Sequence, residues 1–180
     1  EDGTVRLGSV NWADGVTRAN FGEAMTLSSP IRLLAHAGES FCTLTVDGRL
    51  LYEKITERRN LVTGEVTLRR REVILPYEAG TNGLPAFLLL SGLGDWALLA
   101  WPDGHAIRYN TRRPEQPFIE ETLSLLDDPS LRLTAVRFLA GQTTVLAGDS
   151  AGRVRVWFPV RSDGTNSSTR LVAARELLGT

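Results

Sequence analysis

The pentapeptide GDSAG, residues 148–152, is the clearest candidate for catalytic chemistry in this chain. The pattern G-x-S-x-G places a serine nucleophile on a sharp turn when a strand precedes it and a helix follows, and it needs a histidine later in the chain. Both histidines, His36 and His105, precede Ser150, and the residues from Arg153 onward alternate polar and apolar like a strand. The sequence therefore predicts a turn at Ser150, and a serine esterase is the alternative.

Three consecutive arginines, Arg69, Arg70 and Arg71, form the basic cluster of the chain, with Arg58 and Arg59 shortly before them. Successive side chains of an extended strand point to opposite faces, so these side chains cannot all form one patch. We expect a solvated outer strand here. Arg69, Arg70 and Arg71 remain the candidate contacts for an anion or a phosphate group.

Groups that could hold a metal or a cofactor are sparse. One cysteine, Cys42, and two isolated histidines offer no metal-ligand spacing. Asp127 and Asp128 begin an Asp-Asp-Pro-Ser segment that is typical of a solvated turn. The segment GLG at residues 92–94 opens no helix that could cradle a phosphate. We therefore expect no metal site, no cofactor and no enzymatic activity.

Composition restricts the partners further. The net charge of −1 argues against nucleic acid as a main partner. The apolar content of 42% is ordinary for a globular domain. The longest apolar runs are far shorter than the roughly 20 residues that a membrane-spanning helix needs. From the sequence we therefore expect attachment to a membrane only through flanking helices outside it.

The elements that position these residues are best seen in residues 131–160. A segment rich in strand-forming residues comes first, followed by a short apolar run, the turn-forming residues 148–152 and a segment that alternates polar and apolar. Pro159 can be accommodated only near a strand end or on an edge. Residues 169–178 contain good helix formers, but we expect a strand there, because it completes a group of four.

The same order of an apolar run, a turn and a second run recurs earlier in the chain. Turn glycines at Gly48, Gly104 and Gly152 are spaced roughly fifty residues apart, and Asp47 and Asp103 precede the first two, which is a strong hairpin signal. Repeats of about 40 to 50 residues with four strands each are typical of β-propellers. The sequence predicts one all-β domain over 1–180, a partial β-propeller of about three and a half four-stranded antiparallel blades. The half blade is 1–30, and the blades are 31–80, 81–128 and 129–180.

The segments DSAGRVRVWFPV and DGTVRLGSV resemble the end of a WD40 repeat, in which a turn of small residues leads into an alternating strand. The resemblance implies that Trp157 occupies the position where such blades bury an aromatic side chain. The sequence departs from the family in that Phe158, not aspartate, follows Trp157, and no Gly-His pair precedes the first strand of any blade. The Asp-His-Ser/Thr-Trp hydrogen-bond network of strict WD40 blades therefore cannot be assembled here.

A narrower resemblance concerns the tail LTAVRFLAGQTTVLAGDSAGRVRVWFPV with the later RLVAARELL. It is similar to a WD40-like region inserted in bacterial phosphate ABC-transporter permeases (PstC-like). This resemblance implies a non-catalytic interaction and regulatory domain at the periplasmic face of the inner membrane. Its partners would be the remaining transporter subunits and the periplasmic phosphate-binding protein. The alternative is a fragment of a cytoplasmic WD40-like scaffold.

The number of blades is itself informative. Propellers close with roughly four to eight blades, and this sequence starts inside a blade. We expect either that the missing blades belong to a longer parent protein or that two chains associate as a homodimer.

Overall fold

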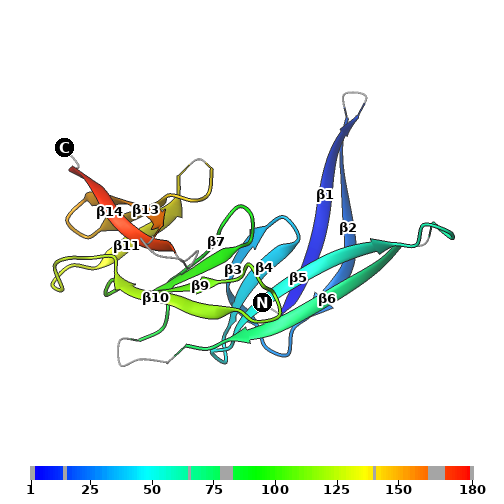
Figure 1. Ribbon diagram of the computed structural model, residues 1–180, viewed down its shortest axis with the longest axis horizontal. Coiled ribbons are helices and arrows are strands. Elements are labelled where there is room, and N and C mark those ends of the chain that lie inside the picture. The colour runs from blue at the N-terminus through cyan, green and yellow to red at the C-terminus, as the bar shows by residue number, and fades with distance from the viewer. Residues whose placement is uncertain are drawn as a thin grey trace.

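A computed structural model describes residues 3–13, 16–64, 66–77, 83–139, 141–161 and 169–178, and every regular element in these ranges is a β-strand. A hairpin of β1 (Thr4–Ala13) and β2 (Val16–Thr26) precedes three four-stranded sheets. Figure 1 shows the sheets following one another across the molecule. Within the described ranges, no helix is long and apolar enough to cross a membrane.

Each sheet is an antiparallel meander of strands that are neighbours in the chain. The first sheet contains β3 (Ile31–Ala37), β4 (Ser40–Thr45), β5 (Leu50–Arg59) and β6 (Val66–Leu75). The second sheet contains β7 (Phe87–Leu90), β8 (Trp96–Ala100), β9 (His105–Asn110) and β10 (Phe118–Ser124). The third sheet contains β11 (Leu133–Phe138), β12 (Val145–Asp149), β13 (Arg153–Arg161) and β14 (Thr169–Leu178).

The recurring glycines lie between the second and third strands of the sheets. Gly48, Gly104 and Gly152 have φ of 83°, 94° and 78°, a conformation that favours glycine because it has no Cβ. A Cβ on Gly104 would also lie 2.8 Å from Cγ of Leu126. Asp103 supports the same turn, because its Oδ1 accepts the His105 N–H at 3.1 Å. Asp47 accepts a hydrogen bond from Arg49 Nε at 3.0 Å beside the Gly48 turn.

Two apolar cores hold the sheets together, and β8 contributes to both. Every residue of β8 is buried. Ala97 and Leu99 point into the core between the first and second sheets, whereas Trp96 and Leu98 point into the core between the second and third. A strand covered on both faces must be apolar at every position, which explains the unbroken run WALLA.

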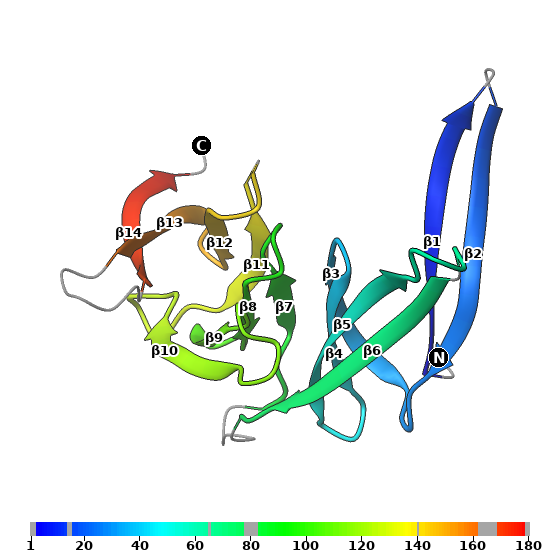
Figure 2. The same cartoon turned by 45° about the vertical axis from the view of Figure 1, so that its right-hand side comes forward.

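The stacking of three four-stranded antiparallel sheets confirms the all-β partial propeller. β7 lies between β3 and β11, so the first strands of the three sheets are next to one another. The β1–β2 pair, expected as half a blade, is a two-stranded sheet that projects away from the others (Figure 2). Residues 1–2, at the start of the segment that resembles a WD40 repeat, and residues 14–15 lie outside the described ranges.

Two features at the end of the chain depend on strand pairing. β14 is a strand along Thr169–Leu178, because it pairs with β13 over its whole length and this pairing outweighs its helix propensity. β13 continues beyond Trp157 through Pro159 to Arg161. β12 pairs with β13 only as far as Trp157, so Pro159 has a sheet neighbour on one side only, the edge position that proline tolerates.

Candidate functional site

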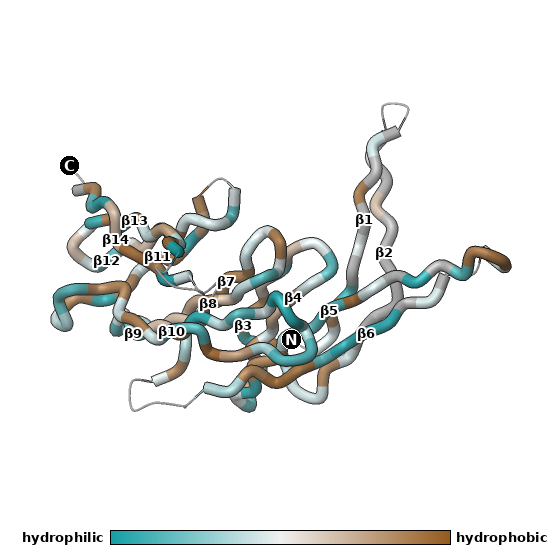
Figure 3. The backbone as a smooth tube through the Cα atoms, in the orientation of Figure 1, coloured by the Kyte–Doolittle hydropathy of each residue, from teal (hydrophilic) through white to brown (hydrophobic). Residues whose placement is uncertain are grey.

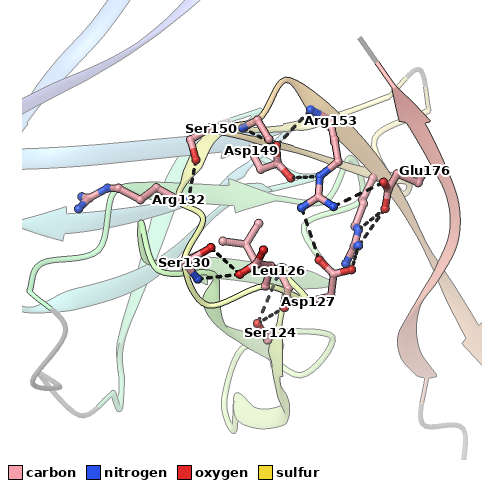
Figure 4. Close-up of polar contacts among 12 residues, drawn as sticks. Ser124, Leu126, Asp127, Ser130, Arg132, Asp149, Ser150, Arg153 and Glu176 are labelled. Atoms are coloured by element: carbon pink, nitrogen blue, oxygen red, sulfur yellow. Dashed lines mark hydrogen bonds and ion pairs between the residues drawn. The ribbon is translucent and has the colours of Figure 1, made fainter.

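Ser150 lies in the turn between β12 and β13, where its hydrogen bonds are structural. Its backbone N–H donates to the carbonyl oxygen of Arg132 at 2.8 Å, and its Oγ accepts the Arg132 N–H at 3.2 Å. Figure 4 shows this pairing. The segment after the turn is the strand β13. Ser150 therefore lacks the strand–serine–helix geometry that a nucleophile on such a turn requires.

Asp149 organises the same turn through its carboxylate. Its Oδ1 accepts the N–H groups of Ala151 and Arg153 at 2.9 and 3.1 Å, and its Oδ2 accepts Arg153 Nε at 2.8 Å. Burial raises the pKa of Asp149, but these hydrogen bonds outweigh burial and hold the pKa below its ordinary value. Arg153 also lies 3.6 Å from Asp127, which follows β10 (Figure 4). The turn thus helps to connect the second and third sheets.

We expect Asp149→Asn to weaken the pH dependence of folding. A carboxylate with a lowered pKa stabilises the fold above its unfolded pKa, near 3.9, and this stability is lost as pH falls through the folded pKa. Urea midpoints measured from neutral pH to about pH 3 should fall less steeply for Asp149→Asn than for the unsubstituted protein. Ser150→Ala, which leaves the Asp149 carboxylate in place, is the control. Equal slopes for all three proteins would contradict this role of Asp149.

Other residues singled out in the sequence take part in the packing of the fold. The His105 ring lies against Trp101, with ring centroids 4.9 Å apart. Cys42 is buried, and burial raises the pKa of its thiol. Trp157 is buried in the core between the second and third sheets. Across the part of the chain that the structure describes, no group of three or more His, Cys, Asp and Glu side chains could hold a metal ion.

The three arginines of β6 are divided between the two faces of the sheet. Arg70 binds the buried carboxylate of Glu53, and its Nη2 donates to Glu72 at 2.9 Å. Arg69 and Arg71 point to the opposite face. Arg71 lies 2.5 Å from Glu115 in the loop between β9 and β10. Arg70 is therefore part of the structure of the sheet, whereas Arg69 and Arg71 face a groove.

Pairing with β5 adds Lys54, which the sequence cluster did not include, and places Arg58 on the same face. Lys54 lies opposite Arg71, and Arg58 lies two residues further along the same face as Thr56, the partner of Arg69. We call Lys54, Arg58, Arg69 and Arg71 the basic face. Among the described residues, no carboxylate forms an ion pair with Lys54, Arg58 or Arg69.

The basic face borders an open groove of about 570 Å³ between β5–β6 and the β9–β10 loop. It is lined by Lys54, Thr56, Arg69, Arg70, Arg71, Pro114 and Glu115. Arg70 contributes to this lining although its guanidinium binds Glu53 and Glu72. Sequence reasoning named Arg58, Arg69 and Arg71 but placed neither Lys54 nor Arg58 on this face. The one signal that could have found them was the register of the β5–β6 hairpin, because residues opposite each other share a face.

No protein-family model matches the chain, and no curated protein matches it. Several solved structures do match the chain. The β-propeller domain of Cps50 (Swd1) from Myceliophthora thermophila has a TM-score of 0.56 at 11% identity, covering 87% of this chain and 49% of that one. A Lactobacillus plantarum protein has a TM-score of 0.51 at 15% identity, covering 98% and 52%.

A Bacteroides fragilis protein provisionally assigned as a 6-phosphogluconolactonase has a TM-score of 0.53 at 14% identity, covering 98% of this chain and 52% of that one. The chain thus spans about half the length of each of these proteins. At such low identities the similarity concerns the backbone alone. It establishes for this chain the fold of part of a β-propeller.

Proposed function

We propose that the chain is a non-catalytic interaction module, in which propeller blades present the basic face to a partner that carries anionic groups. The observation that supports this most directly is the direct cross-strand pairing of Lys54 with Arg71. Like charges directly opposite each other in a sheet are destabilising. Glu115, which lies 2.5 Å from Arg71, offsets part of this repulsion. Lys54 has no such counter-charge among the described residues, so an anionic partner in the groove would relieve the repulsion that remains.

The narrower proposal is that the module is the extracytoplasmic insert of a bacterial phosphate permease. It rests on the similarity of the tail sequence to that of such inserts. The partners would then be other transporter subunits or the periplasmic phosphate-binding protein. This proposal requires apolar segments of about 20 residues on both sides of the module in the parent protein. A parent sequence without such segments would instead favour a cytoplasmic WD40-like scaffold.

We expect Arg69→Glu/Arg71→Glu to weaken binding of a fluorescent polyglutamate peptide by at least tenfold, which corresponds to about 1.4 kcal/mol. The peptide supplies closely spaced carboxylates, so the double charge reversal replaces attraction with repulsion. Fluorescence anisotropy at an ionic strength of about 0.1 M measures the dissociation constant, and a polyglutamine peptide gives the uncharged baseline.

The matched control is Arg170→Glu/Arg175→Glu, which makes the same charge change at two exposed positions of β14. It should bind the peptide within about twofold of the unsubstituted protein, since surface charges beyond a Debye length of about 10 Å are screened. An equal loss in both variants would mean that net charge, and not the basic face, determines binding.

A further inference from the structure

The hairpin that carries the basic face ends in two exposed aliphatic side chains. Asn60 shapes the turn, because its Oδ1 accepts the N–H groups of Val62 and Thr63 at 2.9 and 3.3 Å. Leu61 and Val62 at its apex are 95% and 93% exposed. Figure 3 shows hydrophobic residues at the far end of this projection. We call residues 54–64 and 66–71, most of which extend past the core, the β5–β6 arm.

The tip is convex, which restricts what it can bind. A stable protein interface buries about 800 Å² per partner and needs complementary shape. Two aliphatic side chains at the end of a narrow hairpin provide only a small part of such an area. A fluid bilayer accommodates a small apolar tip without a preformed pocket, and the strength of binding increases with the buried apolar area and with attraction to anionic lipids.

The basic face lies directly behind the tip on the same arm. At about 3.4 Å per residue, Arg58 is about 10 Å behind Leu61. Arg69, opposite Thr56, is about 17 Å behind it, and Lys54, opposite Arg71, is about 24 Å behind it. A negative membrane surface attracts cations only within a Debye length of about 10 Å. All four cations can therefore act together only if the arm lies obliquely along the surface with the basic face toward the headgroups.

A second hairpin provides a second apolar position. In β1, Val10 and Trp12 are exposed on one face of the strand. Tryptophan is the residue that bilayer interfaces favour, because its ring is apolar while its N–H can bond water or headgroups. Figures 1 and 2 both show β1–β2 and the β5–β6 arm projecting from the same end of the molecule, away from β14.

We propose that the β5–β6 arm docks this domain on an anionic lipid bilayer, with Leu61 and Val62 entering the acyl region and the basic face contacting phosphate groups of the lipids. This inference rests on the proposed function, since it names phospholipid headgroups as the anionic partner of the basic face. The acidic peptide described above tests the basic face without lipid, so the two proposals can fail separately.

The first test is co-sedimentation with vesicles of phosphatidylglycerol and phosphatidylcholine in equal parts. The protein should sediment with these vesicles at low salt, be released at high salt, and bind vesicles of pure phosphatidylcholine at least tenfold less. Leu61→Ser/Val62→Ser should lower the partition coefficient by about tenfold, which corresponds to 1.4 kcal/mol. Leu93→Ser is the control, because Leu93 is 86% exposed but lies on the β7–β8 turn.

The second test locates the tip in the membrane. Val62→Trp should give a blue-shifted fluorescence component on phosphatidylglycerol-containing vesicles, and lipids with brominated acyl chains should quench it. The unsubstituted protein, measured under the same conditions, gives the fluorescence background that comes from its four tryptophans. Absence of vesicle binding, unchanged binding by Leu61→Ser/Val62→Ser, or an unquenched indole at residue 62 would each overturn the proposal. If the acidic peptide still binds in that case, the partner of the basic face is a protein.

Discussion

Replacing Arg108 with methionine should lower the free energy of unfolding by about 3–5 kcal/mol, because a buried ion pair loses one partner. Arg108 is only 1% exposed. Its Nε donates to Glu121 at 2.5 Å, its Nη1 lies 3.1 Å from Glu120, and its guanidinium also binds the hydroxyl and carbonyl oxygens of Thr169. Methionine fills much of the volume but leaves the Glu120 and Glu121 carboxylates without their counter-charge.

Arg108→Met/Glu120→Gln/Glu121→Gln should recover a substantial part of this loss, because the triple variant leaves no uncompensated charge. The glutamine oxygens can still accept the N–H groups of Thr169 and Leu171, which now bind Glu120 and Glu121 at 3.0 and 2.8 Å. Urea unfolding of the three proteins measures the differences. A loss below about 1 kcal/mol for Arg108→Met would show that the network behaves like an exposed surface pair.

The second large effect is expected for Trp101→Ala, which should cost about 3–5 kcal/mol through the cavity it leaves. The Trp101 side chain is 1% exposed, and its ring lies 6.0 Å from Tyr77 and 4.9 Å from His105 between centroids. Its Nε1 donates to the carbonyl oxygen of Gly83 at 3.2 Å, so the substitution also leaves that oxygen without this donor.

Trp12→Ala is the matched control for Trp101→Ala. Trp12 is 73% exposed, so its removal should change the stability by no more than about 0.5 kcal/mol. Thermal and urea unfolding of both variants, followed by far-ultraviolet circular dichroism, measure the contrast. Equal losses would mean that the hairpin β1–β2 contributes to the core as strongly as the second sheet does.

The sequence was most informative where local chemistry determines the backbone. Gly48, Gly104 and Gly152 mark turns because each needs a conformation that other residues avoid. The run WALLA in β8 carries the same kind of local signal, because a strand buried on both faces is apolar throughout. The strand at Thr169–Leu178 required an argument about the whole sheet, because its local propensity favours a helix.

The candidate site was only partly accessible from the sequence. Arg69, Arg70 and Arg71 are adjacent in the chain, but the pleat separates Arg70 from the other two. Lys54 and Arg58 join the basic face through hairpin register, which depends on turn geometry and on packing. Arg108 reaches Thr169 in the next sheet, a contact that no local pattern can reveal. The proposed link to phosphate transport depends on similarity of sequence, and the fold supports only the propeller.

The meander connectivity of the sheets has a consequence for biosynthesis. Strands that pair with their immediate neighbours in the chain close short loops, which form quickly and need no distant segment. Each sheet can therefore assemble soon after it leaves the ribosome. The next sheet then covers the exposed apolar face of the earlier one, as in linear repeat proteins. β8 loses its last contact with water only when the third sheet packs against it. The second sheet, although synthesised before the third, therefore completes its packing last.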